Sequence, residues 1–316
     1  MSVYTPLSLE QVQAFAEPFG LAVLELIPIQ AGIQNTNYFL RTAQQQDYVL
    51  TVFEELDTAG AAELVPVLDC LGQAGLPVAV PLKYQGQAIH RIAYKPAQIA
   101  PRLSGTHPDL ATIEQIQAIA IAQAKMHLTL QDFALQRKFY RDHAYWLEVA
   151  QQLKPQLNSA DQAVLTQLLT QFSAITQQHP NRPSGWIHAD LFRDNTLFQG
   201  NTLQGILDFY ELHRDEWLFD IAISINDFCS DLSSFVLNQQ QADAYLAAYQ
   251  TVRVLTVDEQ ACLAIYLAMA AARFWLMRLQ VAQKNAVQGR SGEDILQKDP
   301  LQMRQMLQDR LNRIDA

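Results

Sequence analysis

A short polar segment in the second half of the chain carries the residues best suited to chemistry. It runs His188-Ala-Asp190-Leu-Phe-Arg-Asp-Asn195, and an apolar stretch that ends in Asp208 follows it. Transfer of a phosphoryl group needs a carboxylate that accepts the proton of the attacking hydroxyl, and oxygen ligands that hold Mg²⁺ against the phosphates. The spacing H-x-D-x4-N supplies both, with Asp190 as the base and Asn195 as a neutral metal ligand. We expect Asp208 to be the second, charged ligand.

A predicted hairpin places these ligands together. The turn signal Gln199-Gly200-Asn201 separates two strand-like runs at 196–198 and 203–207, so the ends of the hairpin bring Asn195 and Asp208 close. From residue usage, H-x-D-x4-N is expected by accident in roughly 1% of chains of this length, which favours the catalytic interpretation. The alternative is a His and an Asp that cap a turn between two buried strands.

The composition bounds the class of protein. A chain of 316 residues that is 49% hydrophobic and 17% charged is globular and long enough for two lobes. A net charge of -10 gives no general attraction to nucleic acid or to an anionic membrane, so neither is an expected partner. The cysteines Cys70, Cys229 and Cys262 are odd in number and widely spaced, which argues against a disulfide framework or a structural zinc site.

The sequence shows no pattern typical of an export signal or a membrane span. The first residues lack the basic and apolar regions of an export signal, and the most apolar segment, 261–272, is interrupted by Arg273 and is too short to span a bilayer. We therefore expect a soluble, cytoplasmic protein that acts on a small molecule. The sequence carries no signal of its oligomeric state.

Residues 1–100 predict a mostly β, nucleotide-binding lobe, with a hinge at 99–101. Ser8 begins a helix that Gly20 ends. The polar loop 30–37 would lie over the phosphates, where Gly32 permits close approach; an ordinary hairpin turn is the alternative. Strands are expected at 21–29, 38–41, 47–53, 76–82 and 88–94, and one helix at 54–75.

Residues 101–316 predict a larger, mostly helical lobe that contains the catalytic loop and the substrate site. The expected helices are 113–129, 142–153, 159–177, 220–232, 238–249, 257–283 and 301–314. The sequence therefore predicts an α+β fold, with a small β-rich N-terminal lobe and a helical C-terminal lobe.

Four motifs, in their order along nearly the full chain, resemble the aminoglycoside phosphotransferase and choline kinase superfamily. They are Asn35-Thr-Asn37-Tyr, His188-x-Asp190-x4-Asn195, Leu207-Asp208-Phe and Trp217-Leu-Phe-Asp220. The residues in and around these motifs are similar to those of the bacterial homoserine kinases of this superfamily. The resemblance implies a protein-kinase-like bilobal fold, ATP and Mg²⁺ as cofactors, and transfer to the hydroxyl of L-homoserine, a step of threonine biosynthesis.

The resemblance also implies residue roles. His188 would brace the catalytic loop, and Asp220 would anchor that loop from the following helix. The residues implied over the phosphates are Gly32, Asn35 and Asn37, with Thr51 on the next strand.

Thr51 departs from the superfamily pattern, because many members carry a Lys on this strand that meets the α- and β-phosphates. A Thr hydroxyl donates one hydrogen bond but supplies no charge. The usual Lys–Glu ion pair is therefore in doubt, and with it any role for Glu63. Either the metal carries more of the phosphate charge, or Arg41 or Lys83 replaces the missing cation.

The amino-acid substrate needs a cation for its carboxylate and an acceptor for its ammonium. Arg273 interrupts an otherwise apolar helix and Asp227 follows the metal-binding segment, so we expect them to fill these roles. The alternative for Arg273 is an internal salt bridge between helices.

Two other functions stay open at this level. The same chemistry could act on choline, ethanolamine, hydroxylysine, methylthioribose or an aminoglycoside. The chain could instead be a nucleotide-binding pseudokinase, which Thr51 favours and which the intact set of Asp190, Asn195 and Asp208 opposes.

Overall fold

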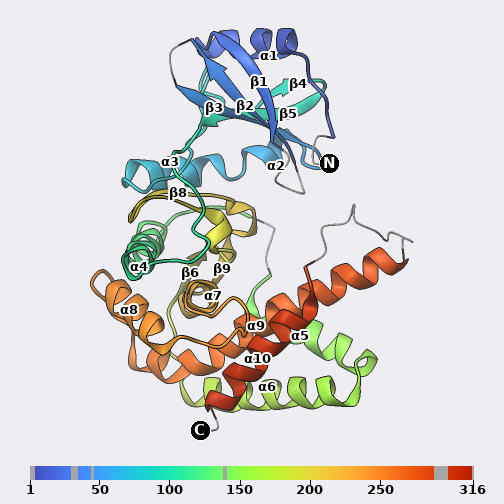
Figure 1. Ribbon diagram of the computed structural model, residues 1–316, viewed down its shortest axis with the longest axis vertical. Coiled ribbons are helices and arrows are strands. Elements are labelled where there is room, and N and C mark those ends of the chain that lie inside the picture. Colours follow the sequence, from blue (N-terminus) through green and yellow to red (C-terminus); the bar gives the residue numbers. More distant parts are fainter. Residues whose placement is uncertain (1–3, 30–34, 44–45, 138–140, 288–297, 315–316) are drawn as a thin grey trace. The chain divides into compact units, whose positions relative to one another are not determined.

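The computed structural model describes residues 4–29, 35–43, 46–137, 141–287 and 298–314. Its internal contacts divide the chain into two compact units. The N-terminal unit comprises residues 1–105 and 204–207, and the C-terminal unit comprises residues 106–203 and 208–316. The first is built on a sheet and the second mainly on helices, as the sequence predicts (Figure 1).

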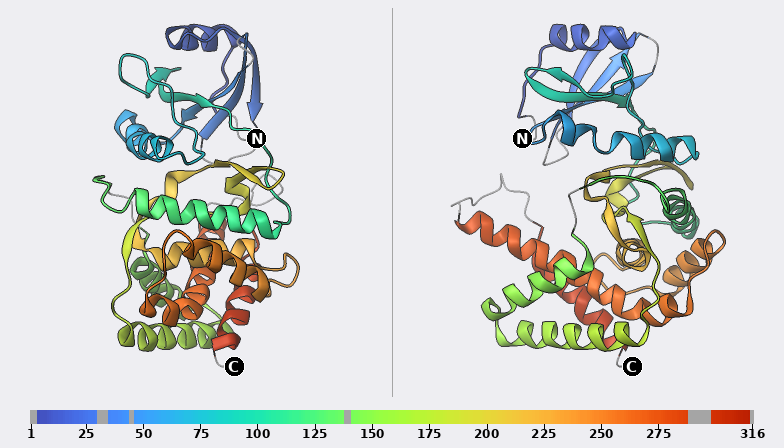
Figure 2. Two further views of the ribbon diagram at one scale, coloured as in Figure 1. Left: turned by 90° about the vertical axis from the view of Figure 1, so that its left-hand side faces the viewer. Right: turned by 180° about the vertical axis from the view of Figure 1, so that it is seen from behind.

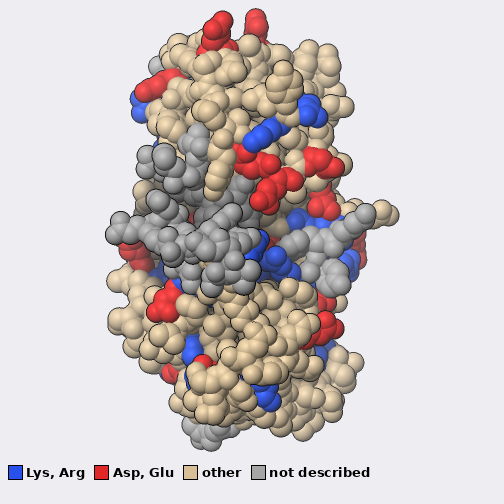
Figure 3. Space-filling view, turned by 90° about the vertical axis from the view of Figure 1, so that its right-hand side faces the viewer, with Lys and Arg blue, Asp and Glu red and all other residues tan. Residues whose placement is uncertain are grey.

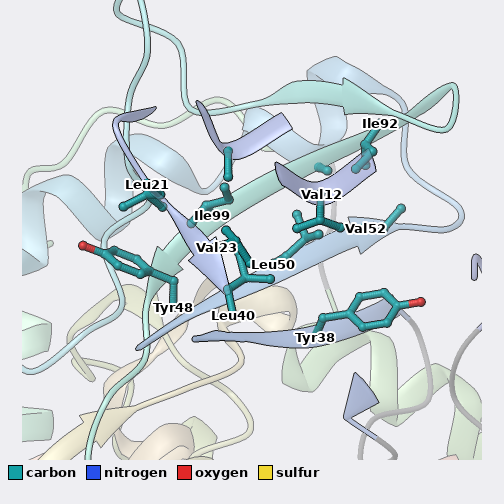
Figure 4. Packing of buried hydrophobic residues seen from close by; sticks show 12 residues of the cluster. Val12, Leu21, Val23, Tyr38, Leu40, Tyr48, Leu50, Val52, Ile92 and Ile99 are labelled. Carbon is teal, nitrogen blue, oxygen red and sulfur yellow. The ribbon is translucent and has the colours of Figure 1, made fainter. Parts of the chain in front are cut away.

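The N-terminal unit contains a five-stranded antiparallel sheet in the order β1-β2-β3-β5-β4. Alternate side chains such as Leu40 and Leu50 are buried on one face, where Val12 of the first helix packs on them (Figure 4). The strands are β1 (Val23–Ile29), β2 (Asn35–Thr42), β3 (Asp47–Phe53), β4 (His90–Ile92) and β5 (Lys95–Pro101).

The first helix, α1 (Leu9–Ala16), shows the predicted signals at both ends. Ser8 forms a full capping box with Gln11, and after a 3-10 turn, η1 (Glu17–Phe19), Gly20 takes a left-handed φ of 75°. A glycine adopts this conformation at little cost, so the chain can turn into the sheet there.

Two predictions for the N-terminal unit are wrong, both because of proline. The helix expected at 54–75 is two helices, α2 (Thr58–Ala62) and α3 (Val65–Gln73), since Pro66 in the first turn of α3 cannot continue a preceding helix. Residues 76–82, which contain Pro77 and Pro81, form only a single bridge from Val78 instead of a strand. The segment expected as a hinge, 99–101, is the end of β5.

The C-terminal unit packs its helices around α9, against which α5, α6, α7 and α10 lie (Figure 2). Side chains of Thr112, Asp142, Asn158 and Asn238 cap four of these helices, in agreement with the predicted starts. The helices are α4 (Ile113–Thr129), α5 (His143–Leu153), α6 (Ser159–Gln178), α7 (Trp217–Phe228), α8 (Gln239–Gln250), α9 (Val257–Val287) and α10 (Pro300–Ile314), with the 3-10 turn η2 (Lys154–Gln156) after α5.

Helix α9 ends four residues beyond the predicted end at 283, and Arg273 lies within it, as in the predicted range 257–283. By length and composition, Val257–Asn285 is apolar enough to cross a membrane, but 78% of its most apolar window is buried inside the protein. We therefore describe α9 as the central helix of the folded C-terminal unit.

Short strands position the catalytic segments. β6 (Ser184–Ile187) pairs with β9 (His213–Glu216), and β7 (Thr196–Gln199) pairs with β8 (Thr202–Ile206) in the predicted hairpin. A Cβ atom at Gly185 would lie 2.5 Å from the indole nitrogen of Trp217, so only glycine fits there. The segments predicted to be catalytic follow these strands. Two 3-10 turns, η3 (Arg193–Asn195) and η4 (Phe209–Glu211), lie in them.

Candidate active site

The turn after β6 holds its backbone in a strained conformation. Ala189, directly before Asp190, has a φ of 68°, which is uncommon for a residue with a side chain. The carboxylate of Asp220 on α7 accepts the backbone N–H groups of Ala189 at 2.7 Å and of His188 at 3.2 Å. Asp220 is completely buried, and its carboxylate holds the backbone of this turn.

Asp190 is oriented by the other end of the same segment. The Asn195 amide nitrogen donates to the Asp190 carbonyl oxygen at 2.8 Å and to its carboxylate at 3.1 Å. Burial raises the pKa of the Asp190 carboxyl to about 7, in spite of the opposing charge of Arg273 and with a further contribution from Asp208. A carboxyl group with a pKa near neutrality is well suited to accept and release a proton.

Asp208, whose charge acts on Asp190, has a left-handed φ of 61°. Desolvation raises the pKa of Asp208, while the nearby His188 ring and the backbone N–H of Tyr210 act to lower it. Within the described part of the chain, neither Asp190 nor Asp208 forms an ion pair with a Lys or Arg. Two neighbouring carboxyl groups with raised pKa values favour the binding of a cation.

The donor set fits a metal ion that is shared with phosphates. Among the residues that the structure describes, no group of three or more His, Cys, Asp or Glu side chains encloses a metal by itself. Asn195 uses its amide nitrogen on Asp190, so its Oδ1 atom remains as a ligand next to the Asp208 carboxylate. Mg²⁺ is commonly bound by one or two carboxylates together with phosphate and water oxygens, which this site can accommodate.

Arg273 contacts the catalytic turn from within the core. It is completely buried on α9, and it donates to the carbonyl oxygen of Ala189 and, at 3.3 Å, to the carboxylate of Glu211. Its guanidinium also lies 4.8 Å from the ring centre of Phe274. These are internal contacts of the kind that the sequence left as the alternative for this residue.

Asp227 is likewise engaged by the protein. Its Oδ2 atom accepts the backbone N–H of Arg193 at 2.7 Å and the Nε–H of the same residue at 2.9 Å. Arg193 begins η3, the turn that ends with Asn195. Asp227 therefore holds the segment that carries the amide ligand.

The N-terminal unit presents neutral groups at Thr51 and at the asparagines of β2. The Thr51 hydroxyl donates to the Asn37 side-chain oxygen at 2.8 Å, and Asn37 and Thr51 are opposite each other in the ladder between β2 and β3. The Asn35 side chain accepts the Glu54 N–H at 3.4 Å. Gly32 lies outside the described residues.

The candidate replacement cations have other partners. Arg41 pairs with Glu25 at 3.0 Å and Lys83 pairs with Asp69 at 2.5 Å, in both cases near the surface. Neither pair includes Thr51 or the asparagines of β2.

A further cation, Lys95, is also committed elsewhere. It forms an ion pair with Glu54 on the face of the sheet that carries the core, whereas Thr51 points to the other face. Lys95 and Glu54 line an open hollow of about 570 Å³ together with Glu55, Asp57 and Arg91. Figure 3 shows acidic side chains gathered next to basic ones on this unit.

One residue near the site, His127, was not predicted from the sequence. It is completely buried in α4, and its Nε2 atom lies 2.9 Å from the carboxylate of Asp220. It follows Ile116, Ala120 and Gln123 at helical spacing on the buried face, and that spacing was the available signal. Glu211, the partner of Arg273, was not predicted either.

Comparisons with known proteins show which family the chain is similar to. The sequence model of the phosphotransferase enzyme family matches residues 25–255. A homoserine kinase of Polaromonas naphthalenivorans is 38% identical, and the alignment covers 88% of this chain and 89% of the relative. A homoserine kinase of Pseudomonas aeruginosa is 34% identical, with 99% and 97% covered.

Solved structures show the same fold at low identity. An amicoumacin kinase in complex with AMP-PNP, Ca²⁺ and amicoumacin has a TM-score of 0.67 at 16% identity, with 97% of this chain and 94% of that chain covered. A spectinomycin phosphotransferase has a TM-score of 0.67 at 13% identity, with 99% of each chain covered. The predicted kinase-like α+β fold is thereby confirmed. On the extent of the family match and of the similarity to these relatives, the chain belongs to the phosphotransferase enzyme family.

Proposed function

We propose that this enzyme transfers the γ-phosphoryl group of ATP to the side-chain hydroxyl of L-homoserine, giving O-phospho-L-homoserine for threonine biosynthesis in the cytoplasm. The observation that carries the chemistry is the anchored turn in which Asn195 holds Asp190 beside Asp208. The choice of acceptor is supported by relatives named homoserine kinase that match this chain over most of its length.

Asp190 would act as the base of this reaction. Its carboxylate accepts the proton of the homoserine hydroxyl as the oxygen attacks the γ-phosphorus. The hydrogen bond from Asn195 fixes the direction of the carboxylate, and Asp220 fixes the backbone that carries it. Orientation of this kind lowers the barrier because the reacting groups meet without a further loss of freedom.

His188 would brace the loop instead of reacting. Its Nδ1 atom accepts the backbone N–H of Asp190 at 3.3 Å, and its ring packs on Phe209 with ring centres 4.6 Å apart. Phe209 directly follows Asp208, so His188 connects the segment of the base with the segment of the metal ligand.

The charge of the phosphates would be balanced mainly at the C-terminal unit. We propose Mg²⁺ as the metal, held by Oδ1 of Asn195 and the carboxylate of Asp208; when bound, it neutralises charge on the phosphate oxygens. Asn35 and Asn37, which were expected in a loop but lie on β2, and Thr51 on β3 would orient the nucleotide through neutral hydrogen bonds. A hydroxyl and amides supply direction but no net charge.

Substrate recognition by Arg273 and Asp227 stays a prediction. Both side chains already satisfy protein groups next to the reacting residues, Arg273 at Ala189 and Asp227 at Arg193. We propose that their contribution to turnover comes from holding these segments in place. The kinetics of an Arg273 variant distinguish this role from a direct contact with homoserine.

The test is a coupled ADP-release assay of the purified protein with ATP, Mg²⁺ and a panel of acceptors. The panel contains L-homoserine, choline, methylthioribose and kanamycin, and the control omits the acceptor. Turnover that depends on L-homoserine supports the proposal. Turnover with another acceptor keeps the catalytic turn and discards homoserine, while no turnover with any acceptor favours the pseudokinase.

A further inference from the structure

A chain of buried polar side chains leads from the surface loop after α8 to Asp220. At the outer end, Arg253 donates to the carboxylate of Glu259 through its two terminal nitrogens, Nη1 at 3.1 Å and Nη2 at 2.5 Å. Arg253 also donates through Nε to the hydroxyl oxygen of Tyr249 at 2.8 Å. The Tyr249 hydroxyl lies 2.7 Å from Nδ1 of His127, whose Nε2 lies 2.9 Å from the Asp220 carboxylate.

Only one arrangement of protons satisfies every donor and acceptor in this chain. An arginine only donates, so the Tyr249 oxygen accepts from Arg253, and the single Tyr249 proton is left for Nδ1 of His127. An ionised carboxylate only accepts, so Nε2 of His127 must carry the ring proton that is donated to Asp220. The geometry therefore specifies a neutral His127, protonated at Nε2.

The electrostatics of the buried groups agree with this arrangement. Burial lowers the pKa of His127, although its contact with Asp220 acts the other way. Burial alone would raise the pKa of Asp220, yet the hydrogen bond from His127 holds it below its usual range. Burial raises the pKa of Tyr249, which keeps its proton at physiological pH.

The arginine that begins the chain has its charge balanced. Glu259 is completely buried, and it also accepts the backbone N–H of Thr256 at 2.8 Å, which fixes the loop between α8 and α9. The guanidinium of Arg253 lies 4.8 Å from the ring centre of Trp217, and the His127 ring stacks on Trp217 with ring centres 5.7 Å apart. A buried charge that is paired and stacked in this way is held in one position.

The charge state of His127 affects how strongly Asp220 holds the backbone of the turn at Ala189. Asp220 uses both oxygens to hold the N–H groups of His188 and Ala189, the latter in a left-handed conformation. An imidazolium at His127 would compete with these N–H groups for the negative charge of Asp220. A neutral ring donates one hydrogen bond and leaves the charge of Asp220 available to the turn.

We propose that Tyr249 and Arg253 are positioning residues of phosphoryl transfer, which keep His127 in the neutral, Nε2-protonated form and thereby hold Asp220 ionised beneath the catalytic turn. They touch neither the substrate nor the reacting atoms. This inference rests on the proposed kinase function only for its kinetic test, because the protonation of His127 can be measured without substrate.

The direct test is the ¹⁵N NMR spectrum of histidine-labelled protein, with His127 assigned through its contacts with the stacked ring of Trp217. We expect a protonated Nε2 and an unprotonated Nδ1 for His127, with no titration between pH 5.5 and 8. An imidazolium, or a proton on Nδ1, overturns the proposal. This spectrum of the unmodified protein decides the question even where a variant fails to fold.

The kinetic test is Tyr249→Phe, which removes the hydroxyl and keeps the ring. We expect His127 to begin to titrate, and kcat to fall by about tenfold, the size expected for one buried hydrogen bond, with both KM values within twofold. The matched control is Tyr245→Phe on the same helix, whose buried hydroxyl donates to Gln123 and not to His127. Unchanged kcat in Tyr249→Phe, or an equal loss in Tyr245→Phe, contradicts the proposal.

Discussion

The two units differ in the groups that they would bring to the proposed reaction. In the C-terminal unit, the carboxyl groups of Asp190 and Asp208 are close enough for their charges to interact, and desolvation raises the pKa of both. In the N-terminal unit, the hydroxyl of Thr51 and the amide of Asn37 are neutral and bonded to each other. Under the proposed function, the first unit would supply the base and the metal site, while the second would direct the nucleotide.

The largest effect is expected at the base. Asp190→Asn removes the proton acceptor while keeping the size of the side chain, so kcat should fall by about 10³-fold, within the range found for general bases. The ADP-release assay measures it. Asp194→Asn is the control, since Asp194 lies in the same turn but is exposed and pairs with Lys298. If Asp190→Asn kept a tenth of the activity, the base would lie elsewhere.

The next effect tests the metal site. Asp208→Asn removes the charged ligand, so kcat should fall by roughly 10- to 100-fold and the Mg²⁺ concentration for half-maximal rate should rise. A titration of the rate with Mg²⁺ at fixed ATP measures both. A lower rate with unchanged Mg²⁺ dependence would mean that Asp208 does not bind the metal.

A third change separates positioning from substrate binding. Arg273→Met puts an unbranched apolar side chain in the place of the arginine and removes the donors to Ala189 and Glu211. We expect kcat to fall by about tenfold and the KM for L-homoserine to stay the same. Thermal unfolding should show a lower Tm, because Glu211 loses its buried partner. A raised KM with normal kcat would restore Arg273 as a substrate ligand.

A smaller effect is expected in the N-terminal unit. Thr51→Val keeps the shape and removes one hydroxyl, so the KM for ATP should rise by about fivefold with little change in kcat, the equivalent of one hydrogen bond. Initial rates at varied ATP concentration measure it. A loss of kcat as large as that of Asp190→Asn would remove the distinction between the two units.

The smallest effect concerns the stability that two ionisable residues contribute, one in each unit. The contributions of His143 and Glu54 should depend on pH in opposite directions. Burial lowers the pKa of His143, but its contact with Asp215 at 2.5 Å, with Glu216 and Asp142 nearby, raises it overall. Burial raises the pKa of Glu54, but the hydrogen bond from Lys95 lowers it overall.

The sign follows from linkage. The stability from His143 is fully present below its unfolded pKa near 6.5 and is lost as pH rises through its higher folded pKa. The stability from Glu54 is present above its unfolded pKa and is lost as pH falls through its lower folded pKa. The Tm deficit of His143→Gln should therefore shrink at alkaline pH, and that of Glu54→Gln at acid pH. Deficits that do not vary with pH would contradict both assignments.

Local signals predicted much of this structure. The capping boxes at Ser8 and Thr112 and the hairpin around Gly200 depend on neighbours within a few residues, so their positions follow from the sequence. Asp190 and Asn195 belong to one motif with fixed spacing, so their proximity follows from the sequence for the same reason. A proline inside a run of good helix formers, Pro66, was the local signal that was overlooked.

The supporting contacts could not be predicted in this way, because they join residues far apart in the chain. Arg273 reaches Ala189 across 84 positions, and His127 reaches Asp220 across 93. A buried Arg or His within an apolar helix shows that a polar partner must exist, but periodicity does not identify the partner. Tertiary packing therefore decides which charged residues serve the catalytic turn.

The most direct measurement is the ³¹P NMR spectrum of the products formed from ATP, Mg²⁺ and L-homoserine, recorded with the unmodified protein and with Asp190→Asn. We predict a phosphomonoester on the homoserine side-chain oxygen together with ADP, and no such product within the same time from Asp190→Asn. Inorganic phosphate without phosphohomoserine, or equal amounts of phosphohomoserine from both proteins, would contradict a kinase whose base is Asp190.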